Sequence, residues 1–269
     1  MDTSFIITHM NIDPLILLAG AVTALAGAVI GNFLLIRKMT LISDSMPHIT
    51  LPGIAIGVLL NINPRVGAMA FLKLAVAVSW TVRFKTTLEL DSIIGVLFVT
   101  SLALGSVLAG GEADLLEAFF GSVEKIARTD ALTVIALGLT VLGVTWQKRR
   151  SLLLSSIDSE VAESIGISPE KSELLFLTLV ALTIAAGINF VGVLLMSSLL
   201  IVPSVTGRTL GGKSLKSFFM ASSIIGVVSA LGGLIISKTY DTGVEPGIII
   251  VFISAGFFVL SLIWNSFRK

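Results

Sequence analysis

Long apolar stretches, separated only by short polar clusters, follow one another along almost the whole chain. A helix needs ~20 mostly apolar residues to cross a bilayer, and the sequence offers such stretches nearly end to end. The apolar fraction of 55% and the charged fraction of 13% in 269 residues exceed what one water-soluble core could enclose. The sequence therefore predicts an all-α polytopic membrane bundle, one domain over residues 1–269, with the lipid bilayer as its solvent.

Apolar runs bounded by charges, proline or glycine predict about nine spans. They lie near residues 15–36, 43–60, 66–82, 92–109, 130–146, 173–188, 190–206, 217–237 and 247–265. The run over residues 173–205 is divided in two, because as one helix it would be ~50 Å long against a ~30 Å hydrocarbon core. We expect its break near Gly187, Ile188 and Asn189.

Lysine and arginine are distributed unevenly between the two sides that this count defines. Such residues concentrate on the cytoplasmic side of membrane proteins. The predicted inner segments carry Arg37, Lys38, Arg83, Lys85, Lys148, Arg149, Arg150, Lys171, Arg208, Lys213, Lys216, Arg268 and Lys269, and the outer ones only Arg65, Lys125, Arg128 and Lys238. The pattern predicts an N-terminus outside and a C-terminus in the cytoplasm.

The predicted span over residues 43–60 contains the sequence LISDSMPHITLPGIAIG, with Asp44 and His48 four residues apart. Positions i and i+4 share a helix face, so the two side chains can supply two ligands to a divalent cation. Ionisable groups inside a membrane are costly and are usually functional. In a structural alternative, one of residues 43–45 caps the helix, Pro47 lies in its first turn, and His48 is an interior side chain.

Two predicted connections are long enough to hold short helices outside the membrane. The outer one, residues 110–129, carries four acidic residues and predicts a surface helix. The inner one, residues 147–171, contains SSIDSEVAESIGISPEK, with serine and aspartate start signals, a stop at Gly166 and Pro169 beyond it. A helix presented to the cytoplasm suits docking of a partner; the alternative is a solvated connector.

The sequence around Asp44 and His48 resembles the second-span motif of the ABC-3 family of metal-importing permeases, in which an Asp, three residues and a His precede Leu-Pro-Gly. Four further blocks resemble that family in the same order. They are LELDSIIGVLFVTSLALGSVLAG, LLEAFFGSV, LLLSSIDSEVAESIGISPEKSELLFL and INFVGVLLMSSLLIVPSVTGRTL. The resemblance extends from about Ile36 to the C-terminus.

This resemblance implies the permease subunit of an ATP-driven importer for manganese, zinc or iron(II) in a bacterial-type plasma membrane. It implies a second copy of the chain, separate ATP-binding-cassette ATPase subunits and an extracellular or periplasmic metal-binding protein. The divalent metal is cargo, with no permanently bound cofactor, no enzymatic activity of the chain itself and no nucleic acid partner.

The resemblance also implies roles for particular residues. Asp44 and His48 match the metal-site pair, and Asp158, Ala162 and Gly166 fall in the segment that resembles the ATPase-coupling loop. Asn189 lies at the expected break in the long apolar run. From its own chemistry we expect its side-chain amide to be a third metal ligand along the pathway. A carboxylate, an imidazole and an amide suit manganese or iron(II), and zinc accepts the same set. The Leu-Pro-Gly form of the motif resembles the manganese and iron members slightly more.

Three features qualify this interpretation. Pro47 stands where the family more often has a small residue, and a proline removes a backbone donor and can kink the helix. GRTLGGKS satisfies the phosphate-loop pattern, but it lies between two predicted spans, where a basic turn explains it better. Lys73 lies inside a span, where we expect it to snorkel or to pair with a carboxylate.

The alternative function is an ion-coupled secondary transporter without ATPase subunits, which the scarcity of intramembrane carboxylates disfavours.

Overall fold

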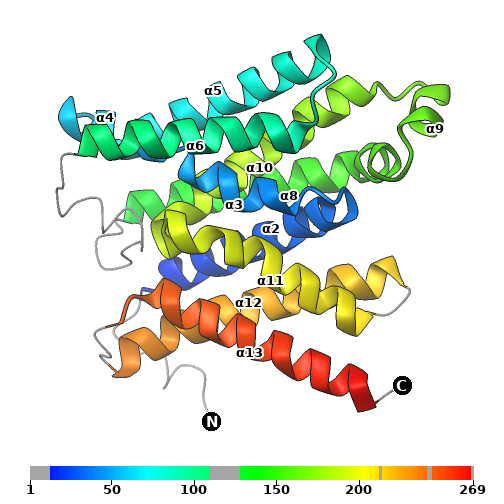
Figure 1. Ribbon diagram of the computed structural model, residues 1–269. Coiled ribbons are helices and arrows are strands. Elements are labelled where there is room, and N and C mark those ends of the chain that lie inside the picture. Colours follow the sequence, from blue (N-terminus) through cyan, green and yellow to red (C-terminus); the bar gives the residue numbers. More distant parts are fainter. Residues whose placement is uncertain (1–12, 110–127, 212–213, 241–243, 268–269) are drawn as a thin grey trace.

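The computed structural model describes residues 13–109, 128–211, 214–240 and 244–267 (Figure 1). Every regular element in these ranges is an α-helix, which confirms the all-α prediction for the described part of the chain. The helices are α2 (Pro14–Ile36), α3 (Thr40–His48), α4 (Leu51–Leu59), α5 (Pro64–Lys85), α6 (Leu90–Ala109), α8 (Arg128–Ile157), α9 (Ser159–Ser164), α10 (Pro169–Val191), α11 (Val193–Gly211), α12 (Leu215–Tyr240) and α13 (Pro246–Phe267). The expected outer surface helix falls mostly on residues outside these ranges.

Seven helices of the described chain are long and apolar enough to cross a membrane: α2, α5, α6, α8, α10, α12 and α13. They coincide with seven of the nine predicted spans. The other two predicted spans correspond to α11 and to the pair α3 and α4, whose nine residues each give only ~14 Å of helix. The count of nine therefore stays a prediction.

Two prolines explain why the predicted span over residues 43–60 is divided between α3 and α4. Pro47 and Pro52 have no backbone N–H, so this stretch lacks two backbone donors five residues apart. Between them the chain makes a tight turn, in which the Thr50 amide donates to the Pro47 carbonyl at 3.1 Å and the Thr50 hydroxyl donates to the same oxygen. The interruption fixes where α3 ends, one residue after Pro47.

The long apolar run breaks at Gly192, and the expected break at Gly187 to Asn189 is wrong by a few residues. Gly192 has φ 79° and ψ 168°, a conformation that residues with a Cβ rarely adopt. Gly187 is helical instead, because it makes room for a neighbour: a Cβ there would lie 2.5 Å from Met196 Cε. One glycine thus serves packing and the other ends the helix.

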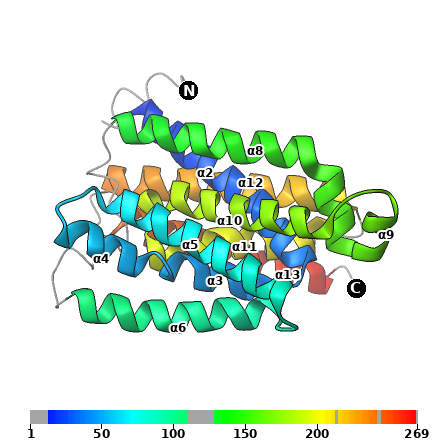
Figure 2. The same ribbon diagram turned by 90° about the horizontal axis from the view of Figure 1, so that it is seen from above.

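Helix α2 runs through the middle of the larger helix group and packs against α8, α10, α11 and α12 (Figure 2). Its small residues bring the backbones close: a Cβ on Gly31 would lie 2.8 Å from the carbonyl carbon of Leu200. Next to it, the buried Asn32 amide donates to Ser222 Oγ at 2.7 Å, which joins α2 to α12. Small residues at helix contacts and interhelical hydrogen bonds are typical of membrane bundles, where lipid competes for apolar surface.

Helices α4, α5 and α6 pack on one another as a second group, and α3 lies between α6 and α11. A close backbone approach in this group joins Gly53 of α4 to Gly67 of α5. A Cβ on Gly53 would lie 2.6 Å from the Gly67 carbonyl carbon, and one on Gly67 would lie 2.7 Å from that of Gly53. The glycine of the Leu-Pro-Gly sequence is therefore a backbone contact point directly after α3.

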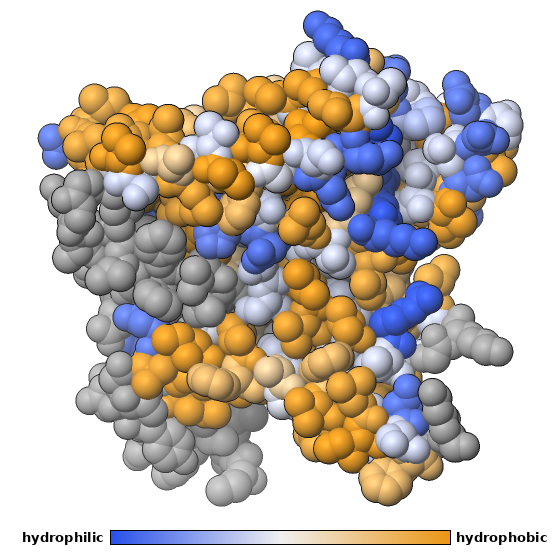
Figure 3. All heavy atoms as spheres, in the orientation of Figure 1, coloured by the Kyte–Doolittle hydropathy of each residue, from blue (hydrophilic) through white to orange (hydrophobic). Residues whose placement is uncertain are grey.

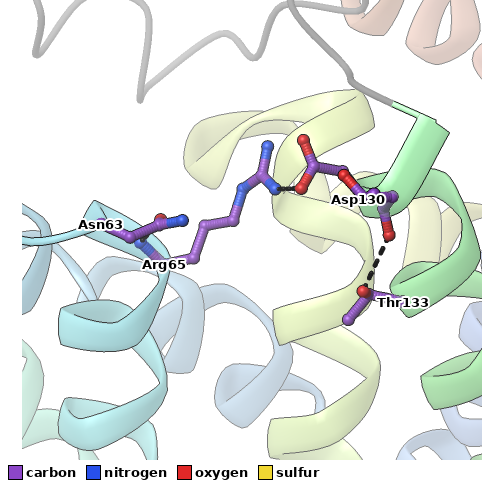
Figure 4. Close-up of polar contacts among 5 residues, drawn as sticks. Asn63, Arg65, Asp130 and Thr133 are labelled. Atoms are coloured by element: carbon purple, nitrogen blue, oxygen red, sulfur yellow. Dashed lines mark hydrogen bonds and ion pairs between the residues drawn. The ribbon is translucent and has the colours of Figure 1, made fainter.

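Ion pairs join helix ends at one end of the bundle. Arg65, at the start of α5, pairs with Asp130, at the start of α8 (Figure 4). Arg128 donates to Asp13 Oδ2 at 2.7 Å, and Asp13 also caps α2 by accepting from the Leu15 amide. The hydrogen bond from the Leu15 amide is the largest cause of a lowered pKa of Asp13, and the hydrogen bond and charge of Arg128 lower it further. The N-terminal ends of α2, α5 and α8 are thereby fixed to each other.

The opposite end carries α9 and most of the basic residues. Helix α8 continues to Ile157, past the predicted span, so Lys148, Arg149 and Arg150 lie on a helix rather than in a loop. On the face seen in Figure 3, hydrophobic surface covers the helix group at the top and that at the bottom, and hydrophilic side chains gather towards the end where α9 lies in Figure 1. The bundle is thus electrically asymmetric along its length.

Candidate metal site and coupling loop

Asp44 and His48 lie one turn apart on α3, in the order that the sequence predicted. The helix begins at Thr40 with Met39 as its N-cap, so the alternative in which one of residues 43–45 caps the helix is wrong. Asp44 is exposed on the surface of the single chain, and His48 is half-buried. The two side chains share a face of a helix that packs between α6 and α11.

His48 is held by packing rather than by a hydrogen bond. Its ring lies edge-on to Phe98 of α6, with centroids 5.4 Å apart. Its Nδ1 is buried without a hydrogen-bond partner among the described residues. A buried polar nitrogen without a partner costs free energy, and at functional sites such a cost is commonly offset by a ligand. The imidazole and the Asp44 carboxylate suit a divalent transition metal.

The described residues of one chain do not bring a third strong ligand to this pair. No group of three or more His, Cys, Asp or Glu side chains with the geometry of a metal centre occurs in the described ranges. Asn189 is a helical residue of α10, three positions before the break at Gly192, and its side chain lies outside the described part of the structure. Its role as a ligand stays a prediction.

The short helix α9 is built as the sequence predicted. Asp158 is its N-cap, with Oδ1 accepting from the amides of Glu160 at 3.0 Å and Val161 at 3.1 Å. Gly166 ends it with φ 83°: its amide donates to the Glu163 carbonyl, and the Ile167 amide donates to the Ala162 carbonyl. This pair of bonds is the Schellman arrangement, which needs a left-handed residue. Both helix ends are therefore fixed by local sequence.

One face of α9 is buried and the other is free in the single chain. Ala162 is fully buried, and α9 packs on α8. Ile157, Val161 and Ile165 follow a spacing of four residues and are 68%, 49% and 60% exposed. Val161 lies on α9, Ile165 is its C-cap and Ile157 is the last residue of α8, so exposed apolar side chains stand on the short helix and at both of its ends. Such side chains at the polar end of a membrane bundle are typical of a protein-docking element.

The sequence did not reveal that Arg37 connects the end of α8, next to α9, with the start of α3. Arg37 follows the last residue of α2 and donates through Nε to Ser156 Oγ at 2.8 Å and through Nη2 to Ser155 Oγ at 3.3 Å, both on α8. Its guanidinium also lies 4.3 Å from the ring centroid of Phe176 on α10. Burial lowers the pKa of Arg37 to about 10, and the charge of Glu173 opposes that effect. The sequence indicated only that Arg37 is a cytoplasmic charge.

Two other motifs have plain structural explanations. Residues 207–211 of GRTLGGKS are helical in α11, so they cannot form a phosphate loop. Lys73 is exposed and lines a groove between α5 and α10, and no carboxylate pairs with it in the described part of the chain. The expectation that it snorkels stays open.

Comparisons with known proteins agree with this architecture. The profile of the ABC 3 transport family matches residues 12–265. The high-affinity zinc uptake system membrane protein ZnuB of Haemophilus influenzae is 35% identical over 254 residues, which cover 91% of this chain and 95% of that protein. The manganese import system permease protein ScaB of Streptococcus parasanguinis is 34% identical over 244 residues, covering 90% of this chain and 86% of that one.

A solved structure has the same fold. PsaBC from Streptococcus pneumoniae, in complex with a Fab, superposes with a TM-score of 0.81 at 27% identity, covering 97% of this chain and 95% of the compared chain. The family match spans nearly the whole sequence. This protein is therefore a multi-pass plasma-membrane protein of the bacterial type, and it belongs to the ABC 3 transport family.

Proposed function

We propose that the chain is the membrane-spanning permease subunit of an ATP-binding-cassette importer that moves manganese, zinc or iron(II) into the cell. The observation that carries the proposal is the Asp44 and His48 pair on one face of α3, inside a bundle of this family. Relatives named for zinc and for manganese support a divalent metal as cargo. Family membership counts against the ion-coupled secondary transporter.

The cargo metal is bound transiently by Asp44 and His48. The carboxylate is exposed on the face of α3, where an incoming cation can reach it, and the half-buried imidazole lies one turn further along the helix. Two ligands hold a metal weakly enough to release it, and a second copy of the chain facing α3 would raise the number of ligands. We assign Asn189, near the outer end of α10, to the same pathway.

ATP hydrolysis takes place in separate subunits that dock on α9. The exposed side chains of Ile157, Val161 and Ile165, on α9 and at its two ends, supply the apolar contact, while Asp158, Ala162 and Gly166 keep the helix formed and seated on α8. Movement of α9 reaches α3 through Arg37, because that side chain binds the end of α8 and lies three residues before α3. A binding protein delivers metal at the opposite end of the bundle.

The proposed orientation has nine crossings, with the N-terminus outside and the C-terminus in the cytoplasm. It is testable because the chain contains no cysteine. A membrane-impermeant maleimide added to intact spheroplasts should label Asn63→Cys, at the start of α5, and should label Glu160→Cys, on α9, only after lysis. Both positions are exposed in the chain. Labelling of Glu160→Cys before lysis would reverse the orientation.

The function itself is tested by metal accumulation. Cells expressing the chain with its candidate ATPase and binding protein are compared by mass spectrometry for manganese, zinc and iron. Asp44→Ala and His48→Ala should each reduce accumulation of one metal to background at matched membrane levels. Glu245→Ala removes an exposed carboxylate just before α13 and serves as the control. Unchanged accumulation in the α3 variants would remove the site assignment, and no accumulation in the assembled wild type would remove the importer proposal.

A further inference from the structure

A groove lies between α2, α8 and α12. It encloses about 680 Å³, within the ~300–1,000 Å³ of typical ligand sites. Leu25 and Val29 of α2, Leu142 of α8, and Phe219 and Met220 of α12 form its apolar walls. Figure 2 shows α8 on the edge of the bundle opposite α6, so this groove and the α3 face lie on different sides of the molecule.

Basic side chains stand at the end of the groove nearest α9. Arg149 of α8 and Lys216, the second residue of α12, both line it and are both exposed. Neither forms an ion pair with a carboxylate of the described residues. Arg149 lies over the ring of Trp146, 4.1 Å from the centroid, which orients the guanidinium at the groove mouth. Tryptophan and arginine at this level are typical of the headgroup region of a bilayer.

Deeper in the groove, one polar side chain is left without a partner. Thr145 lines the groove and is only 4% exposed, and its Oγ1 has no hydrogen-bond partner in the described chain. Thr145 precedes Arg149 by one helical turn, which is ~6 Å along α8 towards the membrane centre. Because the Oγ1 itself is buried, an acceptor that enters the groove at this depth can take its hydrogen bond once the Thr145 side chain rotates about χ1 toward the groove.

We propose that this groove binds an anionic phospholipid of the cytoplasmic leaflet. The phosphate lies between Arg149 and Lys216, an ester carbonyl accepts from Thr145 one turn deeper, and an acyl chain follows the apolar walls. Basic pockets between membrane helices on the cytoplasmic side bind such headgroups, and arginine binds phosphate with two parallel donors. The assignment to the cytoplasmic leaflet rests on the orientation in the proposed function.

A second copy of the chain fits this groove less well than a lipid does. The twofold axis of a membrane homodimer is perpendicular to the bilayer, so residues at equal depth meet across the interface. An interface through this groove would place the two sets of Arg149 and Lys216 near one another, and like charges repel. An anionic lipid neutralises the same charges.

The test measures lipid binding by the full-length purified permease, without metal, ATPase or binding protein. Native mass spectrometry counts phosphatidylglycerol and phosphatidylcholine retained after graded delipidation and re-addition. Wild type should retain phosphatidylglycerol preferentially. Arg149→Gln with Lys216→Gln should weaken that retention by about fivefold per charge, roughly 25-fold for the double variant. Thr145→Val should weaken retention of both lipids, because the ester carbonyl is common to them.

The matched control is Lys148→Gln with Arg150→Gln, which removes the same total charge from the two neighbours of Arg149 on α8, at positions outside the groove lining. Equal losses in the two double variants, or equal retention of the two lipids by wild type, would overturn the proposal. So would a change of oligomeric state in the groove variant, because the groove would then be a self-interface. Lipid binding that persists while metal accumulation fails would remove only the proposed function.

Discussion

The contact between α4 and α5 gives the sharpest test of the packing. In Gly53→Ala, the new Cβ would stand 2.6 Å from the carbonyl carbon of Gly67 and 2.9 Å from Phe71 Cδ2. Ordinary van der Waals contact begins near 3.4 Å. Because the first of these neighbours is backbone, rotation of a side chain cannot relieve the clash, and α4 must move away from α5.

The size of the effect follows from the difference between two alanine variants. Overpacking of this kind costs ~1–3 kcal/mol, whereas replacing a helical glycine by alanine gains up to ~1 kcal/mol by propensity alone. Gly95→Ala on α6 isolates the second effect, because nothing lies within 4 Å of its new Cβ. The two variants should therefore differ by about 1–3 kcal/mol, or roughly 2–12 °C in Tm.

Thermal unfolding of the purified protein in detergent, followed by size-exclusion fluorescence, measures this difference. Gly67→Ala should behave as Gly53→Ala does, since each Cβ would meet the other residue's backbone. The double variant should lose less stability than the sum of the two single losses, because the helices have already separated. If Gly53→Ala melts together with Gly95→Ala, the close backbone contact is not what holds α4 against α5.

Three further predictions concern the ends of the bundle. Arg37→Gln should lose about 1.5–3 kcal/mol of stability, because its charged hydrogen bonds to α8 are removed, and it should lower metal uptake. Lys38→Gln, at the exposed neighbouring position, should stay near wild type in the same thermal unfolding and uptake assays, and equal effects of the two variants would contradict a special role of Arg37. Asp158→Ala should remove the cap of α9 at a cost of ~1 kcal/mol and reduce ATPase stimulation in the assembled complex, and unchanged stimulation would contradict a coupling role. Folding lowers the pKa of Asp13, so this carboxylate stabilises the fold above its unfolded pKa of ~3.9, and that stabilisation is lost as pH falls through the folded pKa. Asp13→Asn should therefore lower Tm at pH 6 and match wild type at the acid end of a pH series, and a constant difference in Tm across the series would refute this.

Local signals in the sequence determined the class of fold and the pieces of the candidate site. Length and hydropathy predict the long helices, because lipid leaves the backbone little choice but to form internal hydrogen bonds. The four-residue spacing of Asp44 and His48 put them on one helix face, and Asp158 and Gly166 define both ends of α9. Each of these features depends on residues a few positions apart, so the chain encodes them without reference to distant partners.

Only the tertiary structure decided which glycine ends a helix and which lets two helices approach. Gly187 packs against Met196 while Gly192 breaks the run, and no local pattern separates these uses. The same holds for Arg37, whose hydrogen-bond partner Ser156 lies 119 residues away. A charge at a helix end satisfies the positive-inside pattern whether it faces water or a neighbouring helix. Its partners are set by how the helices pack, which is a property of the whole bundle.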